Sequence, residues 1–121
     1  MKKYVVILVV LLAALMFCLG MIINALMSVS TLEDLAKAEQ VQVVYVSAET
    51  MQKAQALYDF DACPTGLHFS DRQQVWVRED HHYDYWVLAH ELGHHFAIKL
   101  HGDHSEYAAD VYGMKILRGE L

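Results

Sequence analysis

The stretch VLAHELGHHF, Val87 to Phe96, places two histidines four residues apart, with a glutamate directly after the first. Residues four apart on an α-helix lie on one face, about 6 Å from each other, so His90 and His94 can direct their imidazole nitrogens at one metal ion. Glu91 is rotated by about 100° from His90 around the helix and can stand beside the metal without binding it. The pattern therefore predicts a zinc site in which Glu91 accepts a proton from a zinc-activated water.

A catalytic zinc needs a third protein ligand and an open position for water. Eleven residues separate His94 from Glu106, and Asp110 follows Glu106 at a spacing of four. A short connection makes neighbouring helices antiparallel, so Glu106 can complete the ligand set while Asp110 orients one of the histidines from behind. The alternative interpretation of this acid pair is a solvated helix face with an N-terminal cap.

The two flanks of the motif predict a pair of consecutive helices. Asp84 can cap the helix that contains the motif, and Gly102 can end it. The sequence Asp103-x-x-Glu106 has the form of a capping box and predicts a final helix that continues to about Arg118. Both segments that carry candidate metal ligands are thus expected on helices.

Upstream of the motif, the sequence predicts a helix, a strand and a second helix. Ser30-Thr31-Leu32-Glu33 has the form of a capping box, which predicts a short helix to about Gln40. The β-branched stretch Val41 to Val46 predicts a strand. Ser47 then caps a helix that continues to about Tyr58.

A β-hairpin is expected between these elements and the motif. The stretch DFDACPTG, Asp59 to Gly66, holds the only proline of the chain and predicts a loop. The stretches LHFS and QQVWVRE flank the polar turn Asp71-Arg72 and predict two antiparallel strands. Together the elements predict an α+β domain with a short sheet and two C-terminal helices.

The N-terminal part of the chain predicts a membrane anchor. Two lysines precede an apolar run from Tyr4 to Met27 that is interrupted only by Asn24, and about 20 apolar residues suffice to span a bilayer as a helix. Residues 1–29 are therefore expected to form a single-pass anchor and residues 30–121 the domain. The positive-inside rule leaves the N-terminus in the cytoplasm and the domain outside it. A long signal sequence, cleaved near Ser28 to Ser30, is the alternative.

The charge of the domain excludes one class of partner. All 15 acidic residues follow the apolar run. From Thr31 onward the chain has only seven lysines and arginines, which gives this part a formal net charge of about −8. A phosphate backbone is repelled by such a chain, so nucleic acid is not expected as a partner. Cys18 lies in the apolar run and leaves Cys63 without a partner in the domain, so no disulfide framework is predicted.

The sequence HELGHHF followed by EYAADVYGMKIL resembles the gluzincin metallopeptidases, in particular the minimal domain of ImmA/IrrE-type peptidases and the core of HtpX-like membrane proteases. The resemblance covers Tyr83 to Leu117. It implies a zincin-like (minigluzincin) fold, Zn²⁺ as cofactor and a protein or peptide as substrate. It also implies a role for each matching residue: His90, His94 and Glu106 as zinc ligands, Glu91 as catalytic base, and Asp110 as the partner of a ligand. The strand QQVWV is expected to pair with an extended substrate, as edge strands do in zincins.

Several other residues with polar or aromatic side chains are weaker candidates for a role in the site. His101 is expected at the helix end and His95 in packing or at the surface, while Trp76, Trp86 and Tyr85 are expected in the core. Five residues are candidates for stabilising an oxyanion: His81, His82, His104, Tyr107 and Tyr112.

Two functions of different classes follow from these patterns. The first is a membrane-anchored zinc metallopeptidase with Glu91 as general base. The second is a non-catalytic, zinc-stabilised domain that binds a protein partner, since a domain of about 90 residues has a marginal core and a bound zinc would help it to fold. A purely structural site has no need of Glu91, which separates the two. An intramembrane protease is disfavoured, because the motif helix also carries His95 and Lys99 and only one span is present.

Overall fold

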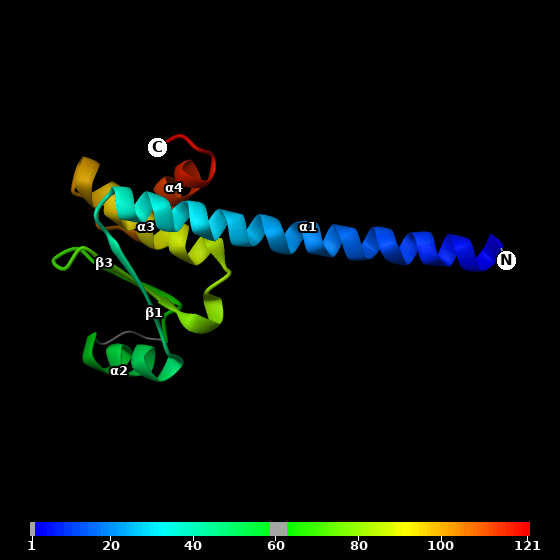
Figure 1. Cartoon of the computed structure of the whole chain (residues 1–121). Helices are drawn as coiled ribbons and strands as arrows, with labels where there is room; N and C mark the ends of the chain where they lie inside the picture. Colours follow the sequence, from blue (N-terminus) through cyan, green and yellow to red (C-terminus); the bar gives the residue numbers. More distant parts are fainter. Residues whose placement is uncertain (1, 59–62) are drawn as a thin grey trace.

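The computed structural model describes residues 2–58 and 63–121 of the chain. Its fold is α+β, mostly helical, with one three-stranded sheet (Figure 1). The elements in chain order are α1 (Lys2–Ala38), β1 (Gln42–Val46), α2 (Ala48–Tyr58), β2 (Gly66–Phe69), β3 (Gln74–Arg78), the 3-10 helix η1 (Glu79–His81), α3 (Tyr85–His101) and α4 (Glu106–Leu117). Residues 59–62 of the loop expected at Asp59 to Gly66 lie outside the described residues, and Gly66 is the first residue of β2.

Helix α1 is continuous from Lys2 to Ala38, so the expectation of a separate helix that starts at Ser30 is wrong. The capping signal is overridden because the helix carries Val29, Leu32 and Ala36 into the core of the domain, where all three are buried. The helix ends where Gln40 adopts a positive φ of 60° and Val41 N donates to Ala36 O at 2.8 Å. The predicted boundary between anchor and domain thus falls inside one helix.

Among the described residues, α1 alone is long and apolar enough to cross a membrane. Its most apolar 18-residue window has a mean hydropathy of 3.2, and none of that window is buried in the protein. The side chains of this window are therefore exposed at the surface of the described chain. Lipid is the favourable solvent for such a surface.

The strands form a sheet in the order β1-β3-β2, with β1 parallel and β2 antiparallel to β3. The hairpin predicted from the sequence is confirmed, but its second strand, β3, is the central strand. The expectation that QQVWV is a free edge for a substrate is therefore wrong. The sequence could not show this, because β1 reaches β3 through a crossover connection that contains α2 and β2.

The two faces of the sheet pack against different helices. Val75 and Val77 of β3 point to the face covered by α1 and α3, while Trp76 between them points to the face covered by α2. Met51 of α2 is fully buried against that second face. The sheet is thus a middle layer between α2 and the helices that carry the metal motif (Figure 1).

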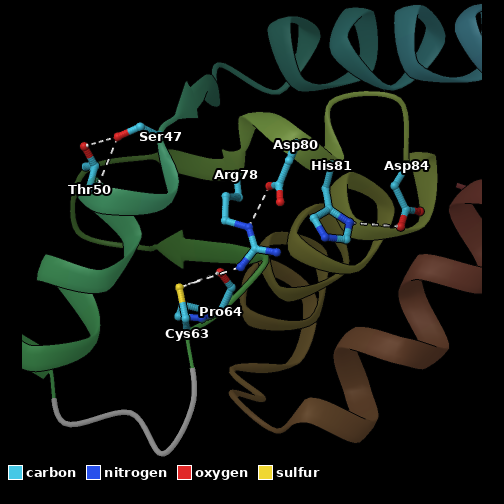
Figure 2. A network of polar contacts seen from close by, with 8 residues as sticks. All are labelled: Ser47, Thr50, Cys63, Pro64, Arg78, Asp80, His81 and Asp84. Carbon is cyan, nitrogen blue, oxygen red and sulfur yellow. Dashed lines mark hydrogen bonds and ion pairs between the residues drawn. The ribbon is translucent and has the colours of Figure 1, made fainter.

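Short polar contacts fix the turns around the sheet (Figure 2). The expected cap of α2 is confirmed, since Thr50 N donates to Ser47 Oγ at 3.1 Å. Arg78 at the end of β3 donates to Asp80 Oδ1 at 2.6 Å and to Cys63 Sγ at 3.7 Å, so it joins the loop before β2 to the segment before α3.

The caps of the last two helices follow the sequence in part. Asp84 accepts from Trp86 N at 3.1 Å, and Gly102 ends α3 with a φ of 64°, as predicted. The cap of α4 is Ser105, whose hydroxyl oxygen accepts from Ala108 N at 3.1 Å, and not Asp103. Asp103 instead accepts from Ser105 N at 2.9 Å and orders the turn before the helix.

Candidate metal centre

Helices α3 and α4 approach each other closely because glycines replace side chains where they meet. A Cβ on Gly93 would lie 2.2 Å from the carbonyl oxygen of Ala109, and one on Gly113 would lie 3.2 Å from that of Ala89. This contact sets the first two turns of α4 opposite the motif on α3. Neither glycine was singled out from the sequence, although their small neighbours at helical spacing, Ala89, Ala97 and Ala109, indicate a close helix crossing.

The structure brings the three predicted ligands together. The Nε2 atom of His90 lies 2.8 Å from one carboxylate oxygen of Glu106, and that of His94 lies 3.3 Å from the other. One ligand atom from each of the three residues falls within 4.8 Å of the others. Tetrahedral zinc with bonds of 2.0–2.1 Å holds its ligand atoms roughly 3.3 Å apart. The group can therefore hold a metal ion with little rearrangement.

Asp110 lies on the far side of His90 from this group. Its Oδ1 atom is 2.8 Å from His90 Nδ1. With the Nδ1 proton donated to Asp110, the lone pair of Nε2 is left free for a metal, and the plane of the ring is fixed. This is the orienting position that the sequence predicts for Asp110.

Glu91 is buried beside the group without belonging to it. Its exposed fraction is 7%. Burial raises the pKa of its carboxyl group from 4.5 to about 8, and the negative charge of Glu106 adds to the increase. A divalent cation bound nearby would counteract both effects, because it favours the ionised carboxylate.

Gly66, the first residue of β2, makes the room that Glu91 occupies. A Cβ at this position would lie 2.8 Å from Glu91 Cγ and 2.9 Å from Glu91 Oε1. Any other residue would displace the carboxylate. In the sequence Gly66 is only the last residue of a predicted loop, so nothing there marks its relation to Glu91.

A cleft of about 220 Å³ opens along the candidate ligands, between β2 on one side and α3 and α4 on the other. The residues that line it are Gly66, Leu67, His68, Ser70, Glu91, His94, Ile98, His104 and Glu106. The strand beside the cleft is therefore β2, which is an edge of the sheet. An extended chain in the cleft would meet the free backbone edge of β2 and the candidate ligands at once.

His68 of β2 is a cleft residue that the sequence reasoning missed. Its ring stacks on that of His94 at 6.0 Å between centroids. Burial lowers the pKa of His68 from 6.5 to about 4, with smaller effects from His94, His95 and His104, so its imidazole is neutral near pH 7. Alternation along the hairpin places it on the same sheet face as Gly66, which is the signal that could have identified it.

Of the residues considered for oxyanion stabilisation, His104 lines the cleft. The others are held elsewhere: His81 lies 3.5 Å from Asp84, His82 stacks on Tyr45, Tyr112 is buried and Tyr107 is exposed.

The remaining sequence expectations concern packing. His95 is buried and lies 3.4 Å from Glu39, as expected for a packing residue, and His101 is exposed in the last turn of α3. Trp86 packs against the core, but Tyr85 does not, because it begins α3 and points outward with 40% of its surface exposed.

Comparisons of the chain with protein-family models, with curated proteins and with solved structures gave no match.

Proposed function

We propose that this protein is a membrane-anchored zinc metallopeptidase of the gluzincin kind, with α1 as its anchor and the cleft beside β2 as its active site. The observation that carries the proposal is Glu91. Its carboxyl group is buried next to the three candidate ligands but is not one of them. Gly66 leaves the space that this carboxyl group occupies. A structural metal site does not require such a group.

The donor set favours zinc. Two imidazole nitrogens and one carboxylate leave a position open, which is the pattern of catalytic zinc sites. When bound there, zinc supplies a Lewis acid that polarises a carbonyl group and makes water more acidic. His90, His94 and Glu106 would hold it, and Asp110 would keep His90 in the tautomer that binds.

The protein groups supply the rest of the chemistry. Glu91 accepts a proton from the attacking water and returns it to the leaving amine, so it acts first as base and then as acid. The edge of β2 pairs with the extended substrate and holds the scissile bond along the cleft. His68 and His104 lie where they can donate hydrogen bonds to the substrate.

The membrane topology is part of the proposal. Helix α1 spans the bilayer with the N-terminus in the cytoplasm, because Lys2 and Lys3 precede the apolar run and the first charges after it are acidic. The domain and its cleft then lie on the extracytoplasmic side. A protease-protection assay on intact cells tests this, and digestion of the domain only after lysis would reverse the assignment.

The test of function is Glu91→Gln in the full-length protein. Glutamine keeps the size of the side chain but is no base near neutral pH. We expect zinc content near one per chain in both proteins, and cleavage reduced by roughly 10²- to 10⁴-fold in the variant. Because the substrate is unknown, the readout is the abundance of membrane-exposed proteins in the native host that carries either version.

Two histidine variants on the same helix control the metal measurement. His94→Ala should lose zinc, whereas His101→Ala, at the exposed end of α3, should retain it. If Glu91→Gln and wild type give the same membrane proteome with zinc bound in both, the protein is instead a zinc-stabilised binding module.

A further inference from the structure

The last turns of α1 are part of the domain core, so a continuous helix, and not a flexible linker, joins the domain to the apolar segment. Leu32 and Ala36 are buried against the sheet and α3. Two polar contacts hold the same region: Tyr45 donates to Glu33 at 3.0 Å, and Lys99 donates to Glu39 at 2.7 Å. The orientation of the domain is therefore set by the direction of α1.

The length of the apolar run determines which part of α1 lies at the membrane surface. The helical stretch from Tyr4 to Ile23 is about 30 Å long, which equals the thickness of a bilayer's hydrocarbon core. Asn24 to Ser28 then lie at the level of the lipid headgroups. The C-terminal end of α4 is at this same level, because Ile116 and Leu117 line one cavity together with Asn24 and Ser28.

Two segments of the domain reach furthest toward the N-terminal end of α1: the turn between η1 and α3, and the end of α4 (Figure 1). Both carry exposed apolar or aromatic side chains. Tyr83 is 62% exposed, Tyr85 40% and Leu117 36%. We call Tyr83, Tyr85 and Leu117 the contact face. Tyrosine is enriched at the membrane interface, where its ring meets lipid and its hydroxyl meets water.

We infer that the contact face rests in the headgroup layer of the bilayer that α1 spans, so that the domain lies on the membrane. The inference rests on the membrane anchor of the proposed function and adds the surface through which the domain meets lipid. The occupant is the bilayer because this face continues the lipid-exposed surface of α1, whose apolar residues are themselves exposed up to Ile23.

A consequence for the substrate follows from the direction of α4. Its 12 residues extend about 18 Å from Leu117 at the headgroups to Glu106 at the candidate metal centre. The cleft is thus held within about 20 Å of the membrane surface. Segments of membrane proteins just outside the bilayer are the chains it can reach.

The experiment measures contact with lipid at single positions in the full-length protein, reconstituted in phosphatidylcholine vesicles. Cys18→Ala and Cys63→Ala remove the native thiols. A fluorophore is then attached to a new cysteine at Tyr83→Cys or Leu117→Cys, and its quenching by lipid with a nitroxide near the headgroup is recorded. The matched control is Leu100→Cys, which is 53% exposed in the last turn of α3, next to Lys99 and the far end of α1.

We expect at least twofold stronger quenching at positions 83 and 117 than at position 100. A label at Phe17→Cys, quenched by lipid with a nitroxide in its acyl chain, reports on the anchor separately. Quenching at position 17 with equal, weak signals at 83, 117 and 100 would overturn the contact face and leave the anchor intact. Absence of quenching at position 17 would overturn the anchor as well. Because 83 and 117 lie on different elements, misfolding caused by one substitution would not hide the result.

Discussion

At the scale of single residues, the setting of Glu91 favours the neutral acid when no cation is near. Its pKa of about 8 comes mainly from burial. A neutral carboxylic acid is no base, so in the proposed mechanism a bound metal would be needed to keep Glu91 ionised near pH 7. In that mechanism the same burial would also keep bulk water away from the reaction.

This setting predicts how the stability of the metal-free protein depends on pH. Folded Glu91 binds a proton up to about pH 8, but in the unfolded chain the group releases it near 4.5. The free energy of unfolding therefore falls as the pH rises between these values. Glu91→Gln lacks this dependence. We expect the variant's advantage over wild type to grow by a few kcal/mol from about pH 5 to pH 8, because each pKa unit corresponds to about 1.4 kcal/mol.

The measurement is urea unfolding with a chelator present, for both proteins at each pH. His68, whose pKa is lowered to about 4, has the opposite effect and adds stability as the pH rises from about 4 to 6.5. It is present in both proteins, so it cancels in the difference. An advantage that stays constant with pH would contradict the buried, protonated Glu91.

A second residue-scale prediction concerns Asp110. Removing its contact with His90 Nδ1 frees the ring to rotate and to change tautomer. We expect Asp110→Ala to bind zinc about 10- to 100-fold more weakly, measured by competition with a chromophoric chelator. The control is Asp71→Ala, an exposed acid in the hairpin turn, which should bind zinc as wild type does. Equal affinities in both variants would remove the orienting role.

At the scale of elements, the site depends on how closely α3 and α4 approach. The candidate ligands come from both helices, and no short-range pattern in the sequence fixes the distance between them. Gly93 and Gly113 fix it. A shift of 1 Å between the helices would separate Glu106 from the histidines by an amount that zinc geometry does not tolerate.

Gly93→Ala tests this dependence. Its methyl group would lie 2.2 Å from Ala109 O, a backbone atom that cannot move alone, so the helices must separate. We expect a loss of stability of about 1–3 kcal/mol and a marked loss of zinc affinity. Gly113→Ala meets its nearest atom at 3.2 Å and should cost less. Gly20→Ala, which meets nothing within 4 Å, should have no effect on either quantity.

At this scale, the sequence could predict the features that depend on residues close together in the chain. The cap at Asp84, the end at Gly102 and the cap at Ser47 are local hydrogen bonds or backbone angles, and all were predicted. The order of the strands could not be predicted in this way, because the pairing of β1 with β3 joins segments far apart in the chain. The same limit applies to the site. Spacing of four brings His90 and His94 together, whereas Gly66 and His68 reach Glu91 and His94 only through the packing of β2 on α3.

At the scale of the whole molecule, the anchor and the domain share one helix. The sequence suggested two units that meet near residue 30, because hydrophobicity falls there and a capping box begins. The structure shows that Val29, Leu32 and Ala36 belong to the core. The helix that can enter the membrane is therefore also a packing partner of the helix that carries the metal motif.

This arrangement predicts where the chain can be cut to give a folded soluble domain. A protein that begins at Ser28 keeps all three core residues of α1 and should unfold cooperatively and bind zinc. One that begins at Gln40 removes that side of the core. Each large apolar side chain lost from a core costs about 2–5 kcal/mol, against a total stability of about 5–15 kcal/mol for a small protein. We therefore expect the shorter protein to be largely unfolded and to bind zinc weakly. Calorimetry measures the stability of the two proteins, and zinc titration measures their affinity for zinc. As a control, Leu32→Ala within the longer protein should lose part of its stability with zinc still bound. A shorter protein as stable as the longer one would mean that α1 only tethers the domain and does not help to build it.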